Sequence, residues 1–256
     1  MNSLQKKTLD HTIAHASGDW KLEVTRNNLK NDFNVTVSLL LIASYSEANA
    51  IVAWYRDSNL KGFRAWCRTA ATAMERMLRL REEIILPYPL YLELCWALLS
   101  NDKDLVERMI NVIDDSMPEK KKGDPRFEEY FVTTVLLAWL AEWDVVEARC
   151  QRVLQMNPAP PKQKRQLLDY EFYGALATKD VEKMGMAIKK MLEPRELRKN
   201  EVFETGYNVN LFSSKVITCL KLAWVHGVQV KVESDLIPVD LLPWEQQDGV
   251  LMLDFM

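Results

Sequence analysis

A helical hairpin pattern occurs three times in the middle of the chain. Each copy has an apolar run, a short polar break that ends in aspartate, and a second run with apolar residues at steps of three and four. The copies begin near Leu92, Val132 and Asp169. Because the breaks are too short to join anything but antiparallel neighbours, the pattern predicts three helical pairs.

The aspartates at the breaks are expected to cap the second helix of each pair. They are Asp104, Asp144 and Asp180, and the first two are followed three residues later by Glu107 and Glu147, which is the spacing of a capping box. An Asp carboxylate at this position accepts from unpaired N–H groups and complements the helix dipole. The spacing between copies is typical of stacked helical pairs, so we predict an all-α fold of antiparallel hairpins in a repeat-like bundle or solenoid.

The remaining apolar runs predict further helices on both sides of the hairpins. The last helix should end at Gly227, and Val228, Val230 and Val232 alternate so that they could form one short edge strand. We expect a single all-helical domain over residues 1–256. Its parts are a weakly patterned N-terminal segment with one helix near 3–17 (1–30), an N-terminal helical pair (31–86), the three hairpins (87–193), and a last helix with an acidic segment (207–256).

Composition agrees with a soluble helical protein. The chain has only 8 Gly, which disfavours tight β-turns and phosphate-binding loops. The N-terminus has no apolar run of the signal-peptide type, and the longest apolar stretch, 35–43, is about half of what a bilayer requires. We therefore expect a cytoplasmic protein with no membrane partner. The cysteines should be buried reduced thiols because each lies alone in an apolar run, and they are Cys67, Cys95, Cys150 and Cys219.

Charge is unevenly distributed along the chain. Residues 232–256 contain six acidic residues and no Lys or Arg, whereas basic and acidic residues are interspersed elsewhere. This balance and a pI of about 5.8 argue against direct nucleic-acid binding. Exposed Trp residues and complementary charges are common in protein interfaces. We therefore hypothesise that a partner protein contacts a set of aromatic and acidic residues, namely Trp143, Asp235, Asp240, Trp244, Glu245 and Asp248. The alternative is that residues 235–243 (DLIPVDLLP) simply pack against the last helix.

No motif in the sequence indicates reaction chemistry. His11 and His15 stand four residues apart, but no third ligand lies at metal-site spacing, so we expect surface histidines. The lysine run at 120–122 reads as a solvated loop. Nucleophile, phosphate-loop and dinucleotide motifs are missing from the sequence. We expect no enzyme activity, no cofactor and no metal.

Several of these runs resemble the bacterial immunity protein 49 family. The likeness is carried by FRAWCRTAATAMERML (63–78), LELCWALLSNDKDLVERMI (92–110) and DLIPVDLLP, and it extends over residues 35 to 245. The resemblance implies an all-α cytoplasmic protein that binds and neutralises a cognate toxin domain, often a nuclease, of a polymorphic, contact-dependent or type VI secretion system. It implies no catalytic residues.

Two other classes remain open at this stage. A tetratricopeptide-like adaptor would bind another protein or a peptide, but its consensus positions are mostly absent and the spacings of 40 and 36 residues depart from 34. A helical enzyme would need a cleft with titratable groups of shifted pKa, assembled from distant parts of the chain.

Overall fold

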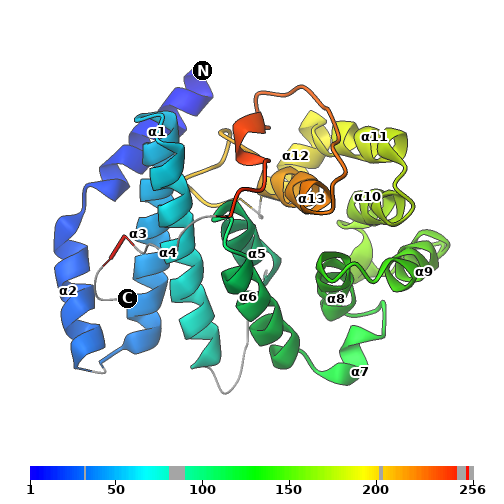
Figure 1. Ribbon diagram of the computed structural model, residues 1–256, viewed down its shortest axis with the longest axis horizontal. Helices are drawn as coiled ribbons and strands as arrows, with labels where there is room; N and C mark the ends of the chain where they lie inside the picture. The colour runs from blue at the N-terminus through cyan, green and yellow to red at the C-terminus, as the bar shows by residue number, and fades with distance from the viewer. Residues whose placement is uncertain (32, 81–89, 202–203, 247–251, 254–256) are drawn as a thin grey trace. The chain divides into compact units, whose positions relative to one another are not determined.

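The regular secondary structure of the described residues is all helical, which confirms the all-α prediction. The computed structural model describes residues 1–31, 33–80, 90–201, 204–246 and 252–253, and over these residues it contains helices α1–α13 and no strand (Figure 1). The chain divides into two compact units. Unit 1 comprises Met1–Ile113, Glu204–Phe212 and Glu245–Met256, and unit 2 comprises Asp114–Phe203 and Ser213–Trp244.

Unit 1 is built around the pair α3 and α4. Its helices are α1 (Ser3–Ala16), α2 (Asp19–Lys30), α3 (Val35–Tyr55), α4 (Leu60–Arg79), α5 (Leu90–Leu99) and most of α6 (Lys103–Ser116). Helices α1 and α2 pack on α3, and α5 packs on α4. The sequence predicts α1 but not α2, since α2 is polar and carries no clear apolar stripe.

Helix α3 is the core helix of unit 1. By length and composition it would also be long enough and apolar enough to cross a membrane, and it is much longer than the apolar stretch 35–43. In the structure α1, α2 and α4 surround it, and Leu39, Ile42 and Ile51 have no exposed surface. Burial on most sides accounts for a helix that is apolar around most of its circumference.

Unit 2 is built around α10. Its helices are α7 (Glu119–Lys122), α8 (Glu128–Trp139), α9 (Trp143–Leu154), α10 (Leu167–Ala177), α11 (Val181–Met191), α12 (Pro194–Asn200) and α13 (Ser214–Val225). Helix α10 contacts α8, α9, α11 and α13. The ring of Phe131 near the start of α8 lies 5.6 Å from that of Tyr170 near the start of α10, so the two helices begin side by side. All four cysteines of the protein are buried and free of disulfides, as expected.

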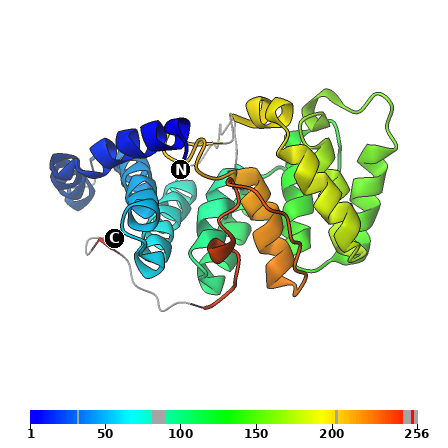
Figure 2. The ribbon, with the colours of Figure 1, turned by 90° about the horizontal axis from the view of Figure 1, so that it is seen from above.

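Two buried lysines on α13 tie it to its neighbours. The Nζ atom of Lys215 lies 2.6 Å from the Asp169 carboxylate on α10 and donates to the carbonyl oxygen of Arg165 at 2.9 Å. Lys221 donates to the carbonyl oxygens of Leu241 and Pro243 at 2.8 and 2.9 Å. The segment after α13 is therefore held back along the helix that precedes it (Figure 2).

The short edge strand expected at the C-terminal end of α13 is wrong. Val228, Val230 and Val232 are buried as their alternation suggests, but residues 228–232 form no strand. Val230 packs on α11, since its Cγ1 lies 3.9 Å from the position that a Cβ on Gly185 would occupy. A strand needs an unpaired neighbouring backbone, whereas a helix has already satisfied its own N–H and C=O groups.

The three predicted hairpin turns share one backbone geometry. Helices α6, α9 and α11 each begin two residues after a residue in the left-handed region, namely Asn101 (φ 56°), Ala141 (φ 61°) and Lys179 (φ 55°). The turns thus repeat as predicted. A continuous solenoid is not confirmed, because the first turn belongs to unit 1 and the other two to unit 2.

The aspartates that cap these helices differ from the predicted ones in two of three cases. Asp180 caps α11 as predicted, accepting a hydrogen bond from the backbone three residues on at 3.0 Å. In α6 the cap is Asp102, which accepts the equivalent bond at 3.2 Å, and Asp104 lies inside the first turn. In α9 the N-cap residue is Glu142, whose side chain makes no cap bond, and Asp144 again lies inside the helix.

Candidate functional site

Trp143 stands at the end of the turn between α8 and α9. Its ring is edge-on to the ring of His226 at the end of α13, with the centroids 4.7 Å apart. Burial lowers the pKa of His226, and the carbonyl groups of Ala138 and Trp139 oppose this shift without cancelling it. His226 is therefore neutral at pH 7. It gives Trp143 an aromatic support, while the indole remains half-buried.

Trp244 is also half-buried and packs within unit 2. Its ring lies 5.7 Å from that of Trp139, and the Nζ of Lys221 lies 5.4 Å from the Trp244 ring centroid. In the segment before it, Ile237 and Leu241 are buried. The apolar part of residues 235–243 thus packs against α13, as the alternative reading of this segment expected.

The acidic side chains of residues 235–243 face solvent. Asp235 and Asp240 are exposed, and neither forms an ion pair with a described residue. Leu236 accepts a hydrogen bond from the backbone of Ser213, which places Asp235 near the start of α13. Trp143 lies at the other end of this helix, and a helix of this length spans about 18 Å. The structure therefore spreads the predicted residues along α13 instead of gathering them at one point.

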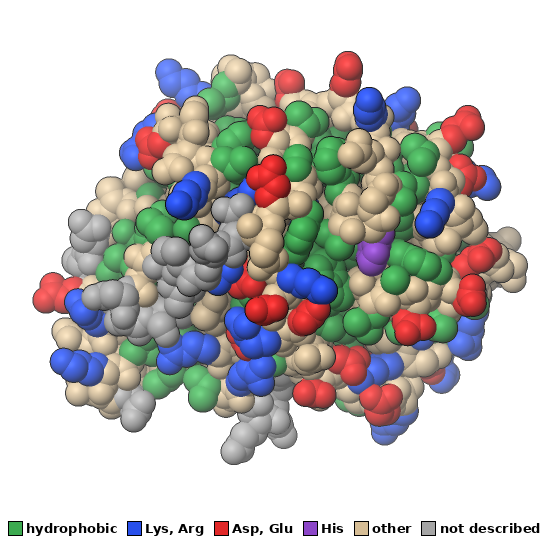
Figure 3. All heavy atoms as spheres, viewed as in Figure 1, with side chains coloured by type: hydrophobic (Ala, Val, Ile, Leu, Met, Phe, Trp, Pro, Cys, Tyr) green, Lys and Arg blue, Asp and Glu red, His purple; other side chains and the backbone are tan. Residues whose placement is uncertain are grey.

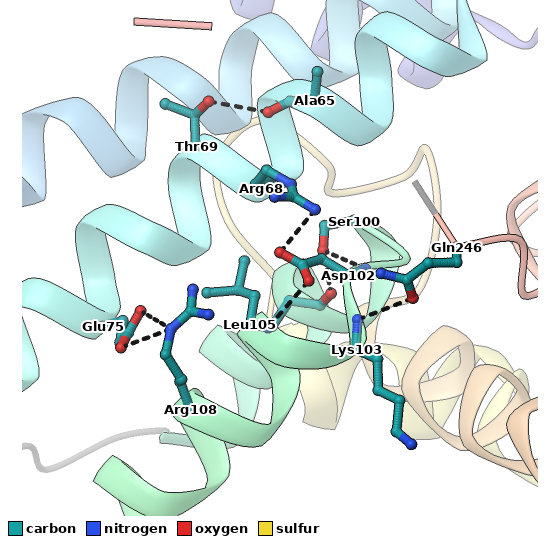
Figure 4. Close-up of polar contacts among 11 residues, drawn as sticks. Ala65, Arg68, Thr69, Glu75, Ser100, Asp102, Lys103, Leu105, Arg108 and Gln246 are labelled. Atoms are coloured by element: carbon teal, nitrogen blue, oxygen red, sulfur yellow. Dashed lines mark hydrogen bonds and ion pairs between the residues drawn. The ribbon is translucent and has the colours of Figure 1, made fainter. Parts of the chain in front are cut away.

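Glu245 belongs to unit 1 and covers the turn between α5 and α6. Its carboxylate accepts from Nη1 of Arg64 at 3.3 Å, and its carbonyl oxygen accepts from Nδ2 of Asn101 at 3.1 Å. In Figure 4 the neighbouring Gln246 accepts a hydrogen bond from the backbone of Lys103 at 3.4 Å. Asp248, the last residue of the predicted set, lies outside the described residues.

The most deeply buried charges in unit 2 serve the fold. Asp169 is completely buried, which raises its pKa, and the nearby ammonium of Lys215 opposes that shift. The pair is enclosed by α10 and α13, and Asn200 of α12 lies 3.4 Å from the same ammonium. Because its two side chains are only 2 and 0 % exposed, this ion pair holds helices together and cannot meet a substrate.

A groove of about 410 Å³ runs over α10 between α9 and α11. Leu154 and Met186 contribute apolar surface, and Glu171 and Lys190 form an ion pair across it at 3.0 Å. Burial raises the pKa of Cys150 in its floor to about 12, so the thiol is not ionised at neutral pH. The groove offers contact surface without a reactive group.

The two other groups that could carry chemistry, the histidines of α1 and the lysine run at 120–122, contact neighbouring side chains. The rings of His11 and His15 lie 4.8 Å apart beside Tyr207, and the described residues contain no group of three metal-ligating side chains. The lysine run at 120–122 forms most of α7 rather than a solvated loop. Lys122 is almost fully buried, and its Nζ lies 2.8 Å from Asp114.

Comparison with known families identifies the chain. A family model described as immunity protein 49 matches residues 45–241, which run from the middle of α3 to Leu241, whose carbonyl oxygen accepts from Lys221. Neither the curated proteins nor the solved structures contain a match to this sequence. Immunity families neutralise toxins and are typically non-enzymatic, which agrees with the expectation that the chain is not an enzyme. The protein belongs to the immunity protein 49 family.

Proposed function

We propose that this protein binds its cognate toxin directly and that the toxin is a nuclease. Membership of an immunity family supports neutralisation. Direct contact is the simplest mechanism for a chain whose described pockets hold no reactive group. A nuclease needs a cationic surface to bind phosphates, and an acidic partner can compete for that surface.

The observation that carries this proposal is the rigid mounting of exposed carboxylates on unit 2. Asp235 and Asp240 face solvent, while the hydrogen bond from Ser213 to the carbonyl oxygen of Leu236 and the burial of Ile237 fix the backbone between them. A segment ordered before binding loses little conformational entropy when the partner arrives. We include Trp143, Trp244, Glu245 and Asp248 in the proposed contact set.

The proposed function also implies a cellular compartment for the protein. A toxin that cleaves nucleic acid acts in the cytoplasm, so we place the immunity protein there, with delivery of the toxin by type VI secretion or another contact-dependent route. Acidic and basic side chains are mixed over the face seen in Figure 3, so we expect local charge complementarity instead of one large acidic field.

The test is co-expression of the tagged protein with the product of the adjacent open reading frame. Capture of a stable complex and rescue of growth would support neutralisation by contact. A toxic neighbour that is neither captured nor neutralised would contradict it. In the complex, the double substitution Asp235→Lys and Asp240→Lys should weaken binding, whereas Asp10→Lys, an exposed site on α1 outside the matched region, should not.

A further inference from the structure

The turns of the second and third hairpins lie at the same end of unit 2. Helices α10 and α13 run parallel and end together, because Asp169 pairs with Lys215 near their starts and Tyr173 contacts Cys219 four residues further on in each helix. Helix α9 runs antiparallel to α10, with Cys150 of α9 opposite Gly174, where an added Cβ would come within 3.3 Å of Cys150 Cβ. The start of α9 therefore lies beside the α10–α11 turn, and the contact between Trp143 and His226 brings the end of α13 to the same place.

This end of unit 2 exposes apolar side chains around a tryptophan. Leu140, Val145 and Val181 are 57, 44 and 47 % exposed, and Trp143 is half-buried between the two turns. Hydrophobic side chains gather over the ends of α8, α9 and α10 in Figure 3. A partly exposed Trp with a rigid aromatic support has the properties of an interface anchor.

Carboxylates border these apolar residues. Glu142, Asp144 and Glu182 are exposed, and no described lysine or arginine forms an ion pair with them. Two lysines, Lys179 and Lys183, lie close in sequence to Glu182, and Lys183 is paired with Asp180 at 2.9 Å. The surface thus has an apolar centre and a net negative border, which matches a partner with an apolar projection flanked by cations. We call it the hairpin-end surface, and it comprises Leu140, Glu142, Trp143, Asp144, Val145, Val181 and Glu182.

We propose that the hairpin-end surface is the docking site of the cognate toxin, which presents to it an apolar side chain between Lys or Arg residues. This inference rests on the proposed function and specifies the surface that performs it. It differs from the contact set predicted from the sequence, because the anchor is the pair of hairpin turns and the C-terminal acids are outlying contacts.

The experiment measures the affinity of purified variants for the protein encoded by the adjacent open reading frame. The double substitution Leu140→Lys and Val181→Lys should weaken binding by about 100-fold, because it places two hydrated charges in the apolar centre. The matched control is Leu154→Lys with Met186→Lys. These residues are 42 and 48 % exposed and line the α9–α11 groove, so their substitution should leave the affinity within about threefold of wild type.

A second pair of substitutions tests the border. Glu142→Lys with Asp144→Lys should slow association by about tenfold at low salt, with a smaller difference at high salt, because exposed charges steer encounter and are screened. Circular dichroism should show unchanged helicity in all variants.

The outcomes separate the two proposals. If the wild-type protein does not bind the neighbouring product, the proposed function fails, and the docking site fails with it. If the wild type binds and the Leu140–Val181 variant binds equally well, the docking site is wrong while the function stands. Equal losses in this variant and in the groove control would also overturn the assignment.

Discussion

The turns α5–α6 and α8–α9 have the same backbone and opposite surroundings. Asn101 and Ala141 occupy the same left-handed position two residues before the next helix. Yet Asn101 is completely buried and the next residue, Asp102, is 4 % exposed, whereas Ala141 and Glu142 are both exposed. One turn is an internal joint, and the other is open surface.

The side chains explain the difference. In the first turn Asp102 caps α6 and also pairs with Arg68 of α4 at 2.8 Å (Figure 4). Asn101 donates a hydrogen bond to the carbonyl oxygen of Glu245 in the C-terminal segment. In the second turn the Glu142 side chain makes no cap hydrogen bond, and the Ala141 side chain has no polar atom. A repeated backbone turn therefore becomes a buried joint where its polar side chains form hydrogen bonds and ion pairs with other elements. Where they do not, as at Ala141 and Glu142, the turn stays exposed.

Breaking the joint should have the largest effect on stability. Asp102→Ala removes a helix cap and leaves the nearly buried guanidinium of Arg68 without its carboxylate, since the two side chains are 6 and 12 % exposed. We expect a loss of about 3 kcal/mol in the free energy of unfolding, measured by urea denaturation.

Two controls accompany this substitution. Glu142→Ala, at the equivalent position of the open turn, should change the free energy of unfolding by less than about 0.5 kcal/mol. Asp104→Ala should lower it by only about 0.3 kcal/mol, through the loss of a favourable interaction with the helix dipole. If Asp104→Ala were as costly as Asp102→Ala, the cap would be the one that the sequence pattern predicts.

Asn101→Gly should have the next largest effect. Glycine keeps the left-handed backbone without strain, but it cannot donate the side-chain hydrogen bond to the carbonyl oxygen of Glu245. That carbonyl oxygen then loses its Asn101 donor. We expect a loss of about 1 to 2 kcal/mol by the same denaturation assay. An unchanged free energy of unfolding would mean that the C-terminal segment does not stabilise the turn.

Acid should weaken the region beneath the open turn through His226. Its pKa is lowered in the folded protein, so the unfolded chain binds more protons in the pH range between the folded pKa and about 6.5. Stability from this residue is therefore present above that range and falls as the pH falls through it, by at most about 1.4 kcal/mol per pH unit. Urea denaturation of wild type and His226→Gln at pH 7.5 and 5.5 measures this. The difference between the two proteins should shift in favour of the variant at pH 5.5, and a constant difference would exclude the effect.

Most of the helices could be predicted because the sequence signals that specify them lie within each helix. A long apolar run identifies α3, apolar residues at steps of three and four identify α4 and the second helix of each pair, and Gly227, with φ 75°, ends α13 as predicted. The cap of α6 could not be predicted with the same certainty. Asp102 and Asp104 lie two residues apart, and the choice between them depends on contacts with Arg68, a residue of another helix.

The candidate surface was predictable only in part, for a similar reason. Trp143 stands in a break between helices, so its partial exposure follows from the sequence. Leu140 and Val181 look like any other apolar residue at a helix end, and only the packing of α8 to α11 shows that they are exposed. Lys221 carried a signal, a lysine within an apolar helical run, but its carbonyl partners lie 20 and 22 residues further along the chain.

The smallest effect is expected for a glycine substitution in the open turn. Its sign should be opposite to that of Asn101→Gly at the equivalent position of the buried turn. Ala141→Gly should raise the free energy of unfolding by about 0.5 to 1 kcal/mol, since Ala141 holds a left-handed φ without any side-chain contact that requires it. Ala148→Gly makes the same chemical change at an exposed position inside α9 and should lower it by about 1 kcal/mol. If both changes destabilised the protein, Ala141 would be fixed by packing. The open turn would then be a second joint, and the hairpin-end surface would lose its distinction from the covered turn.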